Sequence, residues 1–365
     1  MKQKKEKYYS LSRLLSHEAQ YRIVFGERSS GKTYAILKHG IEKYYKGKGQ
    51  IAYLRRWTDD FTGKRGSALF AGIVEKGEIT KITKGEWTGV YYYGSCWYLC
   101  KWEDNKRIIA EDPFCYGFSL SGQEHDKAPS YPNITTIFLD EFLARTGYLS
   151  EEFVLFTNVL STIIRKRDNV EIFMAGNTIN KYACPYFSEM GLTNVKRMKH
   201  GDIDVYTYGE STLKVAIEYA EPTEKTEGNN AYFAFGNPKL NMITDGSWEL
   251  ALYPHCPCKY FPKDILFSYF IKFDNEFLQC DIVNSNDLYF TFIHRKTTPL
   301  KNPDTDLIYS QEYSPKPNYK RRITNPASTI EEKITRFYKE DRIFYQDNEV
   351  GEIVRNYLIW CSRQK

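Results

Sequence analysis

The sequence predicts a two-domain protein with an α/β N-terminal domain and a smaller α+β C-terminal domain. A chain of 365 residues and 42.8 kDa is longer than one ordinary domain. Apolar runs of strand length alternate with helical patterns as far as about residue 208, whereas three strand-like runs follow one another between residues 265 and 293. A polar stretch at residues 221–230 separates the two patterns. We therefore expect domains at residues 1–205 and 236–365, with a linker region over residues 206–235.

The composition is ordinary for a globular protein. The net charge of +5 is mildly basic, which is compatible with a polyanionic partner but does not establish one. The basic residues 1–7 are not followed by an apolar segment, and no run approaches membrane-spanning length, so we expect no secretory signal and no membrane partner. Eight scattered cysteines favour reduced thiols in a cytosol. His255, Cys256 and Cys258 lack a second ligand pair at zinc spacing, which argues against a zinc site.

A glycine-bounded loop follows the apolar run at residues 21–25 and precedes a helical pattern. Gly26 and Gly31 allow the backbone to turn so that amide groups and a helix N-terminus converge on phosphate oxygens. Lys32 is placed to reach the β and γ phosphates, and the Thr33 hydroxyl to take one position on Mg²⁺. This context predicts a phosphate-binding loop for a nucleoside triphosphate, formed by Gly26, Glu27, Arg28, Ser29, Ser30, Gly31, Lys32 and Thr33.

The segments after this loop continue the α/β pattern. Residues 50–54 form a second buried strand that delivers Arg55 and Arg56 to its carboxyl end, where an open α/β sheet places its ligands. Residues 85–110 contain aromatic runs separated by turns, which predicts an antiparallel hairpin or meander inserted into the domain. Its aromatic side chains could stack on nucleic-acid bases, but packing between strands is the simpler interpretation.

A further apolar strand, at residues 134–139, ends in Asp140 and Glu141. In a phosphate-loop fold, the first carboxylate holds Mg²⁺ directly or through water, and the second polarises the attacking water. Two carboxylates at a strand end can also be merely solvated. The phosphate-binding loop predicts such a second motif independently, so we favour the functional interpretation.

A helix and another strand follow the two carboxylates. The helix ends at Arg165, where the helix dipole alone favours a cation. The strand at residues 170–175 leads to Asn177, whose amide either senses the γ-phosphate or only turns the chain. Taken from the residues alone, both positions have a structural and a functional interpretation.

The C-terminal domain is predicted from three successive strands and two helices, the helices at residues 329–340 and 351–361. Three aspartates near the strands nominally suggest a metal-dependent nuclease site. Their spacing is only what turns between strands would give. These aspartates are Asp274, Asp281 and Asp287.

Three segments, at residues 21–61, 131–142 and 165–177, resemble the DNA-packaging ATPases of small tailed phages of the phi-twenty-nine group. The resemblance implies a ring-forming ATPase of the additional-strand class of P-loop proteins, related to FtsK and HerA translocases and to large terminases. Such motors assemble as pentamers at the portal vertex of the procapsid, on a packaging RNA, and thread double-stranded DNA into it inside the bacterial host. The C-terminal domain then resembles a degenerate ribonuclease-H-like domain, and we expect no nuclease activity.

The resemblance also implies roles for individual residues. Lys32 and Thr33 bind the phosphates and Mg²⁺ of ATP, Asp140 binds Mg²⁺, Glu141 is the catalytic base, and Arg165 is a finger that acts on a neighbour's ATP. Two further basic residues have family counterparts. Lys127 falls where the family places a second basic group that acts between subunits, and Arg55 falls at a strand-end arginine of the family.

Two alternatives remain from the sequence. The chain could be a different translocase of the FtsK or HerA type, acting on DNA or protein, or a nucleotide-gated assembly factor with little turnover. For a motor we expect salt-sensitive DNA contacts that ignore base sequence. The candidate basic residues for these contacts, to which we assign no site, are Lys64, Arg65, Arg145, Lys196 and Arg197.

Overall fold

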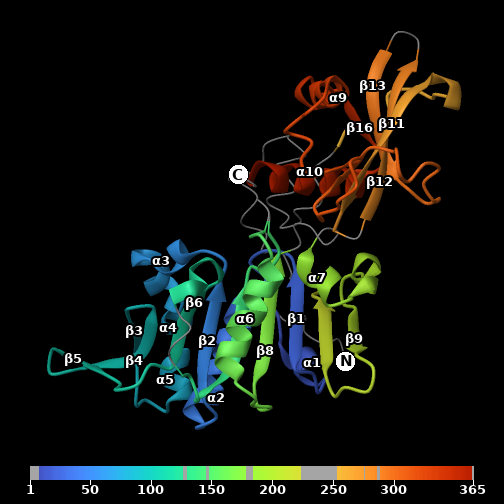
Figure 1. The fold of residues 1–365 in the computed structure, drawn as a ribbon. Helices are drawn as coiled ribbons and strands as arrows, with labels where there is room; N and C mark the ends of the chain where they lie inside the picture. The colour runs from blue at the N-terminus through green and yellow to red at the C-terminus, as the bar shows by residue number, and fades with distance from the viewer. Residues whose placement is uncertain are drawn as a thin grey trace, which may run out of the picture. The chain divides into compact units, whose positions relative to one another are not determined.

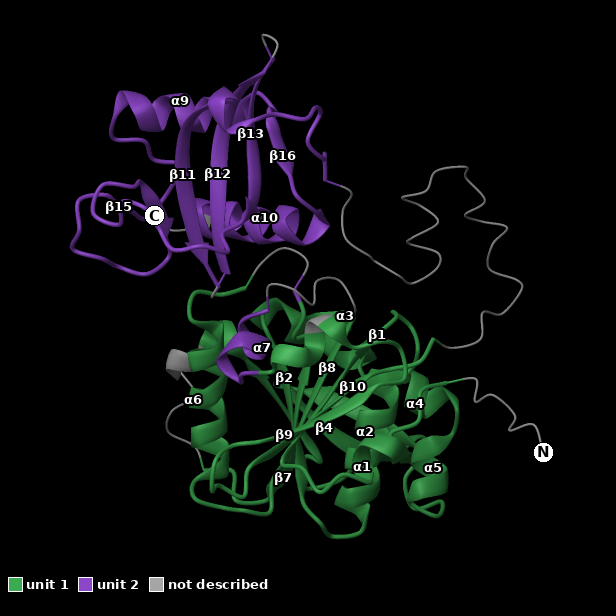
Figure 2. Ribbon diagram, turned by 90° about the vertical axis from the view of Figure 1, so that its right-hand side faces the viewer, with its two compact units in different colours: residues 1–143, 148–178, 192–248 green, residues 144–147, 179–191, 249–365 purple. Residues whose placement is uncertain are grey.

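The computed structural model describes two compact units (Figure 2). Unit 1 comprises residues 1–143, 148–178 and 192–248, and unit 2 comprises residues 144–147, 179–191 and 249–365. The two-domain α/β organisation expected from the sequence is therefore present. Within these units the structure describes residues 8–125, 130–144, 148–177, 184–222, 253–274, 276–285 and 288–363.

Unit 1 is built on one ten-stranded sheet (Figure 1). Its strands are β1 (Tyr21–Gly26), β2 (Gln50–Arg55), β3 (Gly89–Tyr93), β4 (Cys96–Glu103), β5 (Lys106–Ile109), β6 (Cys115–Ser119), β7 (Ile134–Asp140), β8 (Glu171–Asn177), β9 (Ile203–Thr207) and β10 (Lys214–Tyr219). Along the sheet they follow the order β3-β4-β6-β2-β7-β8-β1-β10-β9, with β5 paired to β4. The strands from β6 to β10 in this order run parallel, so their carboxyl ends share one edge of the sheet.

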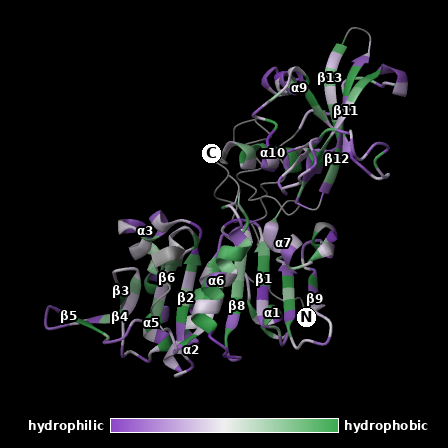
Figure 3. Ribbon diagram, viewed as in Figure 1, coloured by the Kyte–Doolittle hydropathy of each residue, from purple (hydrophilic) through white to green (hydrophobic). Residues whose placement is uncertain are grey.

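Helices cover both faces of this sheet. Figure 2 shows α6 (Glu152–Ile164) on one face, and α2 (Lys32–Tyr45), α4 (Ala71–Glu75) and α5 (Glu78–Ile82) on the other. The remaining helices are α1 (Ser12–Leu15), α3 (Gly63–Ala68) and the 3₁₀ turns Thr58–Phe61, Leu120–His125 and Thr193–Arg197. Because neither face is left to solvent, the central strands contain near-continuous apolar runs (Figure 3).

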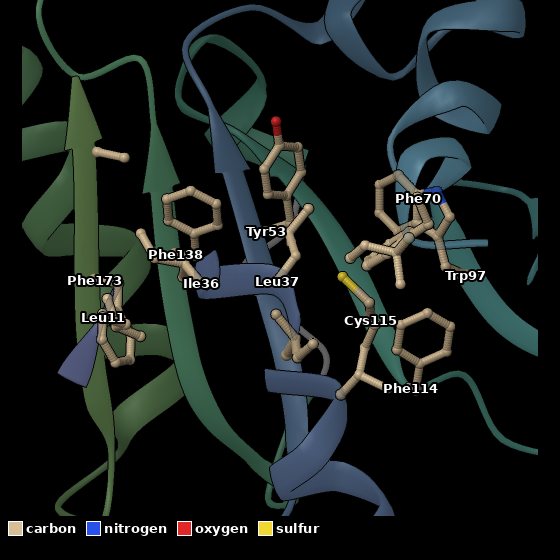
Figure 4. Packing of buried hydrophobic residues seen from close by; sticks show 14 of the residues in the cluster. Leu11, Ile36, Leu37, Tyr53, Phe70, Trp97, Phe114, Cys115, Phe138 and Phe173 are labelled. Atoms are coloured by element: carbon tan, nitrogen blue, oxygen red, sulfur yellow. The ribbon is translucent and has the colours of Figure 1, made fainter. Parts of the chain in front are cut away.

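The core of unit 1 joins three neighbouring strands through aromatic side chains (Figure 4). Tyr53 on β2 packs edge to face against Phe138 on β7, with ring centroids 5.6 Å apart. Phe138 and Phe173, on β8, are fully buried. The Tyr53 hydroxyl points toward the carboxyl end of β2, so this core residue presents its polar atom at the edge where ligands bind.

The aromatic meander predicted for residues 85–110 is confirmed as β3, β4 and β5, which are antiparallel. It extends the sheet, because β4 also pairs with β6. Trp97 is fully buried and its indole N–H donates to the carbonyl oxygen of Gly66 at 2.8 Å. Packing is therefore the role of this side chain, whereas Tyr93 and Trp102 are exposed at 69% and 62%.

The linker predicted over residues 206–235 begins too early. Its first part contains β10, which pairs in parallel with β1 in the register Tyr21↔Val215 to Phe25↔Tyr219. Val215 and Ile217 are fully buried, but this strand is short and carries a charge near each end. Because of those charges and the polar stretch that follows, the sequence pattern does not indicate a strand at β10. Residues 223–252 lie outside the described part of the chain.

Unit 2 contains a six-stranded sheet in the order β15-β14-β11-β12-β13-β16. Three antiparallel strands come first along the chain, and β14, β15 and β16 are added in parallel to β11, β14 and β13 respectively. This confirms the predicted succession of strands and the two C-terminal helices. The elements are β11 (Ile265–Phe273), β12 (Glu276–Ser285), β13 (Leu288–Arg295), β14 (Ile308–Ser310), β15 (Tyr319–Lys320), β16 (Ile343–Tyr345), α7 (Pro185–Glu189), α9 (Thr329–Lys339), α10 (Asn348–Arg363) and the 3₁₀ turn Pro262–Asp264.

One hydrophobic cluster holds unit 2 together. Tyr269 and Ile271 of β11 share it with Ile334 of α9 and with Ile353 and Tyr357 of α10. Both helices therefore pack on the same face of the sheet, on alternate residues of each strand. Among the described residues, no helix is long and apolar enough to cross a membrane.

Candidate functional site: the phosphate-binding loop and its carboxylates

The loop that follows β1 has the backbone that its sequence predicts. Gly31 adopts a left-handed φ of 94° immediately before α2, a conformation that glycine reaches without strain. Ser29 is also left-handed, with φ 63°. The sequence therefore turns sharply twice between the sheet and the helix. This geometry places the N-terminus of α2 at the carboxyl edge of the sheet, where its free amide groups can bind phosphate.

Lys32 lies inside the loop and is almost completely buried. Its Nζ donates to the carbonyl oxygen of Gly26 at 3.3 Å and to the hydroxyl of Ser30 at 3.0 Å. Burial lowers the pKa of Lys32 to about 8, although Asp140 and Glu27 act in the opposite direction. A buried ammonium that bonds only its own loop is positioned to exchange those contacts for the oxygens of a triphosphate.

Asp140, the last residue of β7, is the centre of the carboxylate site. Its Oδ1 accepts hydrogen bonds from the Thr33 hydroxyl at 3.1 Å and from the Glu141 backbone amide at 3.0 Å. Its Oδ2 accepts from the Tyr53 hydroxyl at 3.0 Å. Burial raises the pKa of Asp140 above its usual value, while Arg55 opposes this. The loop threonine and the strand-end aspartate, 107 positions apart, are thus brought into direct contact.

A hydroxyl and a carboxylate oxygen side by side are the hard oxygen donors that Mg²⁺ prefers. Thr33 and Asp140 therefore fit the two protein ligands expected for that ion. Among the described residues, no group of three or more His, Cys, Asp or Glu side chains is arranged to hold a metal alone.

Arg55, at the carboxyl end of β2, contacts the carboxylates. It bonds Glu141 Oε2 at 2.9 Å and Asp60 Oδ2 at 3.2 Å, and it lies 3.6 Å from Asp140 Oδ2. Burial acts to lower the pKa of Arg55, but the surrounding groups Tyr53, Asp140 and Glu141 raise it overall. Arg55 therefore lies at the carboxyl edge of the sheet, as the sequence predicted, and in this structure it pairs with the carboxylates.

Glu141 follows β7 in a left-handed conformation with φ 55°, which is unfavourable for a residue with a side chain. Its side chain is 49% exposed, whereas that of Asp140 is 10% exposed. The two adjacent carboxylates are thus separated into a buried one beside the loop and an accessible one, as expected for different roles.

Asn177 ends β8 and is paired in register with Gly26, the first residue of the loop. The residue therefore lies beside the first residue of the phosphate-binding loop, because the strand register places it there. This position is compatible with the sensing interpretation of Asn177.

Arg165 lies at the opposite edge of the sheet from the phosphate-binding loop. It caps the C-terminus of α6 with φ 41°, and its Nε donates to the carbonyl oxygen of Thr162 at 3.1 Å. It lines a surface cavity of about 630 Å³ with Tyr21, the first residue of β1. The helix-end position predicted from the sequence is confirmed, and Arg165 is not part of its own chain's phosphate site. Lys127, the other expected basic group, lies outside the described residues.

Sequence reasoning missed the contacts of three residues that build the site. Tyr53 was expected only as part of a buried strand, yet its hydroxyl bonds Asp140. Arg56 and Glu152 form an ion pair, and Arg56 also contacts the Glu141 backbone. The signal for Arg56 was its place at the end of β2, but no local pattern identifies its partner.

The aspartates of unit 2 are not arranged as a metal site in the described residues. Asp274 lies in the turn after β11 and accepts a hydrogen bond from the Ser188 hydroxyl at 2.9 Å. Asp281 is buried and accepts hydrogen bonds from Ser268 at 2.7 Å and from His294 at 3.2 Å. Asp287 lies outside the described residues.

Comparisons with known proteins point to one family. Residues 103–226 match the model of the podovirus DNA encapsidation protein (Gp16) family. The DNA packaging protein of Bacillus phage B103 is 26% identical over 189 residues, which cover 49% of this chain and 50% of that protein. The DNA packaging protein of Bacillus phage phi29 is 25% identical over 193 residues, 50% of each. The chain spans about half the length of the curated relatives it matches.

Two solved structures share the fold over nearly the whole chain. The bacteriophage Phi-29 viral genome packaging motor assembly aligns with a TM-score of 0.58 and 17% identity, covering 96% of this chain and 98% of that one. The Phi-28 gp11 DNA packaging motor aligns with a TM-score of 0.57 and 15% identity, covering 98% and 99%. At these identities the likeness concerns the two-domain α/β fold. The family match and the relatives together show that the chain is similar, over about half of its length, to the DNA packaging proteins of phi29-group podoviruses, the resemblance that its sequence predicted.

Proposed function

We propose that this chain is an ATPase of the additional-strand class that drives double-stranded DNA into a viral procapsid. The observation that carries this proposal is the contact between Thr33 of the phosphate-binding loop and Asp140 at the end of β7. One further parallel strand, β8, lies between β1 and β7. That insertion is the feature from which the additional-strand class takes its name.

The residues of the site divide the work of hydrolysis. Lys32 and the amide groups of α2 bind the triphosphate, and Thr33 and Asp140 hold Mg²⁺, which when bound neutralises charge on the phosphates. Glu141 accepts the proton of the attacking water, because it is the accessible carboxylate at this edge. Arg55 holds that carboxylate in this structure, so it must release Glu141 before the base can act. Asn177 beside Gly26 senses the γ-phosphate.

The motor acts as a homo-oligomeric ring, a pentamer, in which each Arg165 enters a neighbour's site. Support for action between subunits comes from the position of Arg165 at the sheet edge remote from its own loop. Lys127 is the second basic group acting between subunits. The ring works in the host cytoplasm at the portal vertex of the procapsid, on a packaging RNA. It binds the phosphate backbone of the DNA, so the contacts do not depend on base sequence.

Unit 2 is a degenerate ribonuclease-H-like domain without nuclease activity. The support is its strand order: three antiparallel strands in sequence, then two strands added in parallel beside the first. No acidic residue occurs in β11. Asp281 is enclosed by hydrogen-bond donors from Ser268, Gln279 and His294, which leaves its oxygens already bonded.

Steady-state hydrolysis with and without double-stranded DNA tests the proposal. A motor is expected to hydrolyse ATP faster when DNA is present, whereas a nucleotide-gated assembly factor is not. Glu141→Gln should bind ATP as well as the unmodified protein but hydrolyse almost none, and Lys32→Ala should lose binding itself. Equal loss of ATP binding in both variants would remove Glu141 as the base. Dependence of turnover on a protein substrate would favour a different translocase.

A further inference from the structure

The N-terminal segment lies directly on the phosphate-binding loop. The Tyr9 amide donates to the carbonyl oxygen of Ser30 at 2.8 Å, and the Tyr9 hydroxyl donates to Glu218 of β10 at 2.6 Å. Tyr8 packs against Gly31, where a Cβ atom would lie 3.4 Å from the Cβ of Tyr8. These contacts fix the Tyr8 ring beside the first turn of α2, one residue from Lys32.

A second tyrosine and a lysine complete a cluster at this place. Tyr34 directly follows Thr33 in the first turn of α2. The Nζ of Lys76, just after α4, lies 4.3 Å from the centroid of the Tyr8 ring and 4.5 Å from that of Tyr34. Both rings therefore face one cation, which occupies the space between them. Tyr8 is 50% exposed and Lys76 is exposed, so this space is open to solvent.

We propose that Tyr8 and Tyr34 form the subsite for the purine base of the nucleotide, and that the base replaces the Lys76 ammonium between the two rings. This inference rests on the proposed function, because it places the base of the same triphosphate that Lys32 binds. Two aromatic rings that each attract a cation through their faces can equally stack on a planar base. The displaced ammonium then donates to a ring nitrogen of the base or moves into solvent.

The position of the cluster relative to the catalytic groups supports this assignment. Thr33 faces Asp140, which marks the Mg²⁺ and γ-phosphate end of the site. Tyr34 is the next residue of the helix and projects about 100° around its axis, away from that contact. Tyr8 contacts Gly31, on the other side of Lys32. The base therefore has a slot next to the phosphates and separate from the carboxylates.

The charge around the slot suits a nucleotide. Lys81 lies beside Lys76, and Glu78 pairs with Lys38 at 2.8 Å and with Lys81 at 2.9 Å. Lys81 also donates to the carbonyl oxygen of Lys76 at 3.2 Å. The Lys76 ammonium, which lies against the two rings, is outside these ion pairs and adds a positive charge to the rim. Stacking recognises the face of a base and not its hydrogen-bonding edge, so we expect purines to bind better than pyrimidines and ATP and GTP to bind about equally.

The test compares ligands with and without a base. Dissociation constants of Mg²⁺-ATP and Mg²⁺-tripolyphosphate are measured for the full chain, for Tyr8→Ala and for Tyr34→Ala. Loss of one stacking ring should raise the dissociation constant of Mg²⁺-ATP about five- to hundredfold and leave that of Mg²⁺-tripolyphosphate unchanged. The Phe variants at both positions should retain ATP affinity. Tyr93→Ala, which removes an exposed tyrosine on β3, serves as the control.

A second measurement, the fluorescence of a bound nucleotide, separates loss of stacking from misfolding of the variant. The triphosphate of 2-aminopurine should lose fluorescence on binding the unmodified chain and regain much of it in Tyr8→Ala, because stacking quenches this base. Equal weakening of ATP and tripolyphosphate would overturn the inference and make Tyr8 a support of the loop alone. Unchanged ATP affinity in both Ala variants would also overturn it. If the unmodified chain binds neither ligand, the proposed function itself fails.

Discussion

Arg56 and Glu152 form an ion pair in which Nε and Nη2 of the guanidinium bond the two carboxylate oxygens at 2.7 and 2.8 Å. The carboxylate is completely buried. The same guanidinium donates to the backbone carbonyl oxygens of Glu141 at 3.3 Å and Phe142 at 2.9 Å. One arginine just after β2 thus holds the backbone of Glu141 and the start of α6. This contact supports the left-handed backbone of Glu141.

Arg56→Lys is expected to slow hydrolysis while leaving ATP binding intact. Lysine retains the positive charge but cannot form the planar fork, so the Glu141 backbone loses its support. We expect a fall in kcat of about 10- to 100-fold, consistent with misplacement of a catalytic group, and little change in the dissociation constant for ATP.

Thermal unfolding separates this effect from simple destabilisation. Arg56→Ala removes the arginine of a buried ion pair and should cost about 3–5 kcal/mol in unfolding free energy. A lysine variant that melts normally yet keeps full kcat would show that the fork has no role in positioning Glu141.

ATP binding is expected to weaken as the pH rises above 8. The pKa of Lys32 is lowered to about 8 in the empty loop, and a bound triphosphate favours the charged form. Binding must therefore take up a proton above that pH, and affinity should fall by up to about tenfold per pH unit. Calorimetry at pH 8 in two buffers of different ionisation enthalpy should give about half a proton per site.

The lowered pKa of Lys32 also determines how the stability of the folded state changes with pH. Because the folded state disfavours the charged Lys32, it binds fewer protons than the unfolded chain between about pH 8 and the ordinary lysine pKa, so this group adds stability as the pH rises there. Lys32→Arg does not titrate in this range and is the control for both measurements. An affinity for ATP that stays constant to pH 9.5 in the unmodified chain would contradict the assignment.

Mixing experiments test the action of Arg165 between subunits. Arg165→Ala should fold and bind ATP but hydrolyse about 10³- to 10⁵-fold more slowly, since a finger has an effect of that size, whereas loss of a helix-end contact costs less than about 1 kcal/mol of stability. Mixed with Lys32→Ala, it should recover some hydrolysis. An intact pocket on one subunit then meets an intact arginine on its neighbour. Mixed rings that form but remain inactive would exclude this arrangement.

The Asp281 and His294 pair predicts how the stability of unit 2 depends on pH. The hydrogen bond to Asp281 raises the pKa of His294 above its usual value. Burial acts to raise the pKa of Asp281, but hydrogen bonds from His294, Gln279 and Ser268 outweigh it and lower that pKa. The histidine contribution is therefore complete below about pH 6.5 and is lost as the pH rises through the raised pKa. The aspartate contribution is present above about pH 3.8 and is lost as the pH falls through the lowered pKa.

Melting curves from pH 5 to 9 measure this dependence. His294→Gln retains a neutral hydrogen-bond donor and should flatten the change between pH 6 and 8. Asp281→Asn should flatten it as well, because the histidine then has no carboxylate to pair with. If both variants retain the full slope, another titrating group is responsible.

Most of the catalytic site could be predicted because it follows local sequence motifs. A loop between a strand and a helix fixes where Lys32 and Thr33 point, and Asp140 ends an apolar run that had to be a central strand. The partners that come from neighbouring strands could not be predicted. Adjacent residues of a strand point to opposite sides, so Arg55 reaches Glu141 while Arg56 reaches Glu152. Only the placement of β2 beside β7 makes these contacts possible.

The order of the strands in the sheet also explains why β10 could not be predicted from the sequence. β10 was missed because its pairing with β1 is distant in sequence, and Glu218 within it looks like a surface charge. In the structure Glu218 is buried and paired with Tyr9 and Arg13. No sequence pattern links Tyr8 and Tyr9 to the phosphate-binding loop; only the fold brings them into contact with it.

The strand β8 connects the region of Arg165 to the phosphate-binding loop of the same chain. It begins six residues after Arg165 and ends at Asn177, so one stretch of extended chain about 23 Å long joins the edge that would meet a neighbour to the chain's own phosphate loop. Such a strand, hydrogen-bonded on both sides, is stiff along its axis. The turn at residues 166–170 lies between Arg165 and β8, so a movement imposed at Arg165 would pass through that turn before it travels along the strand to the phosphate-binding loop.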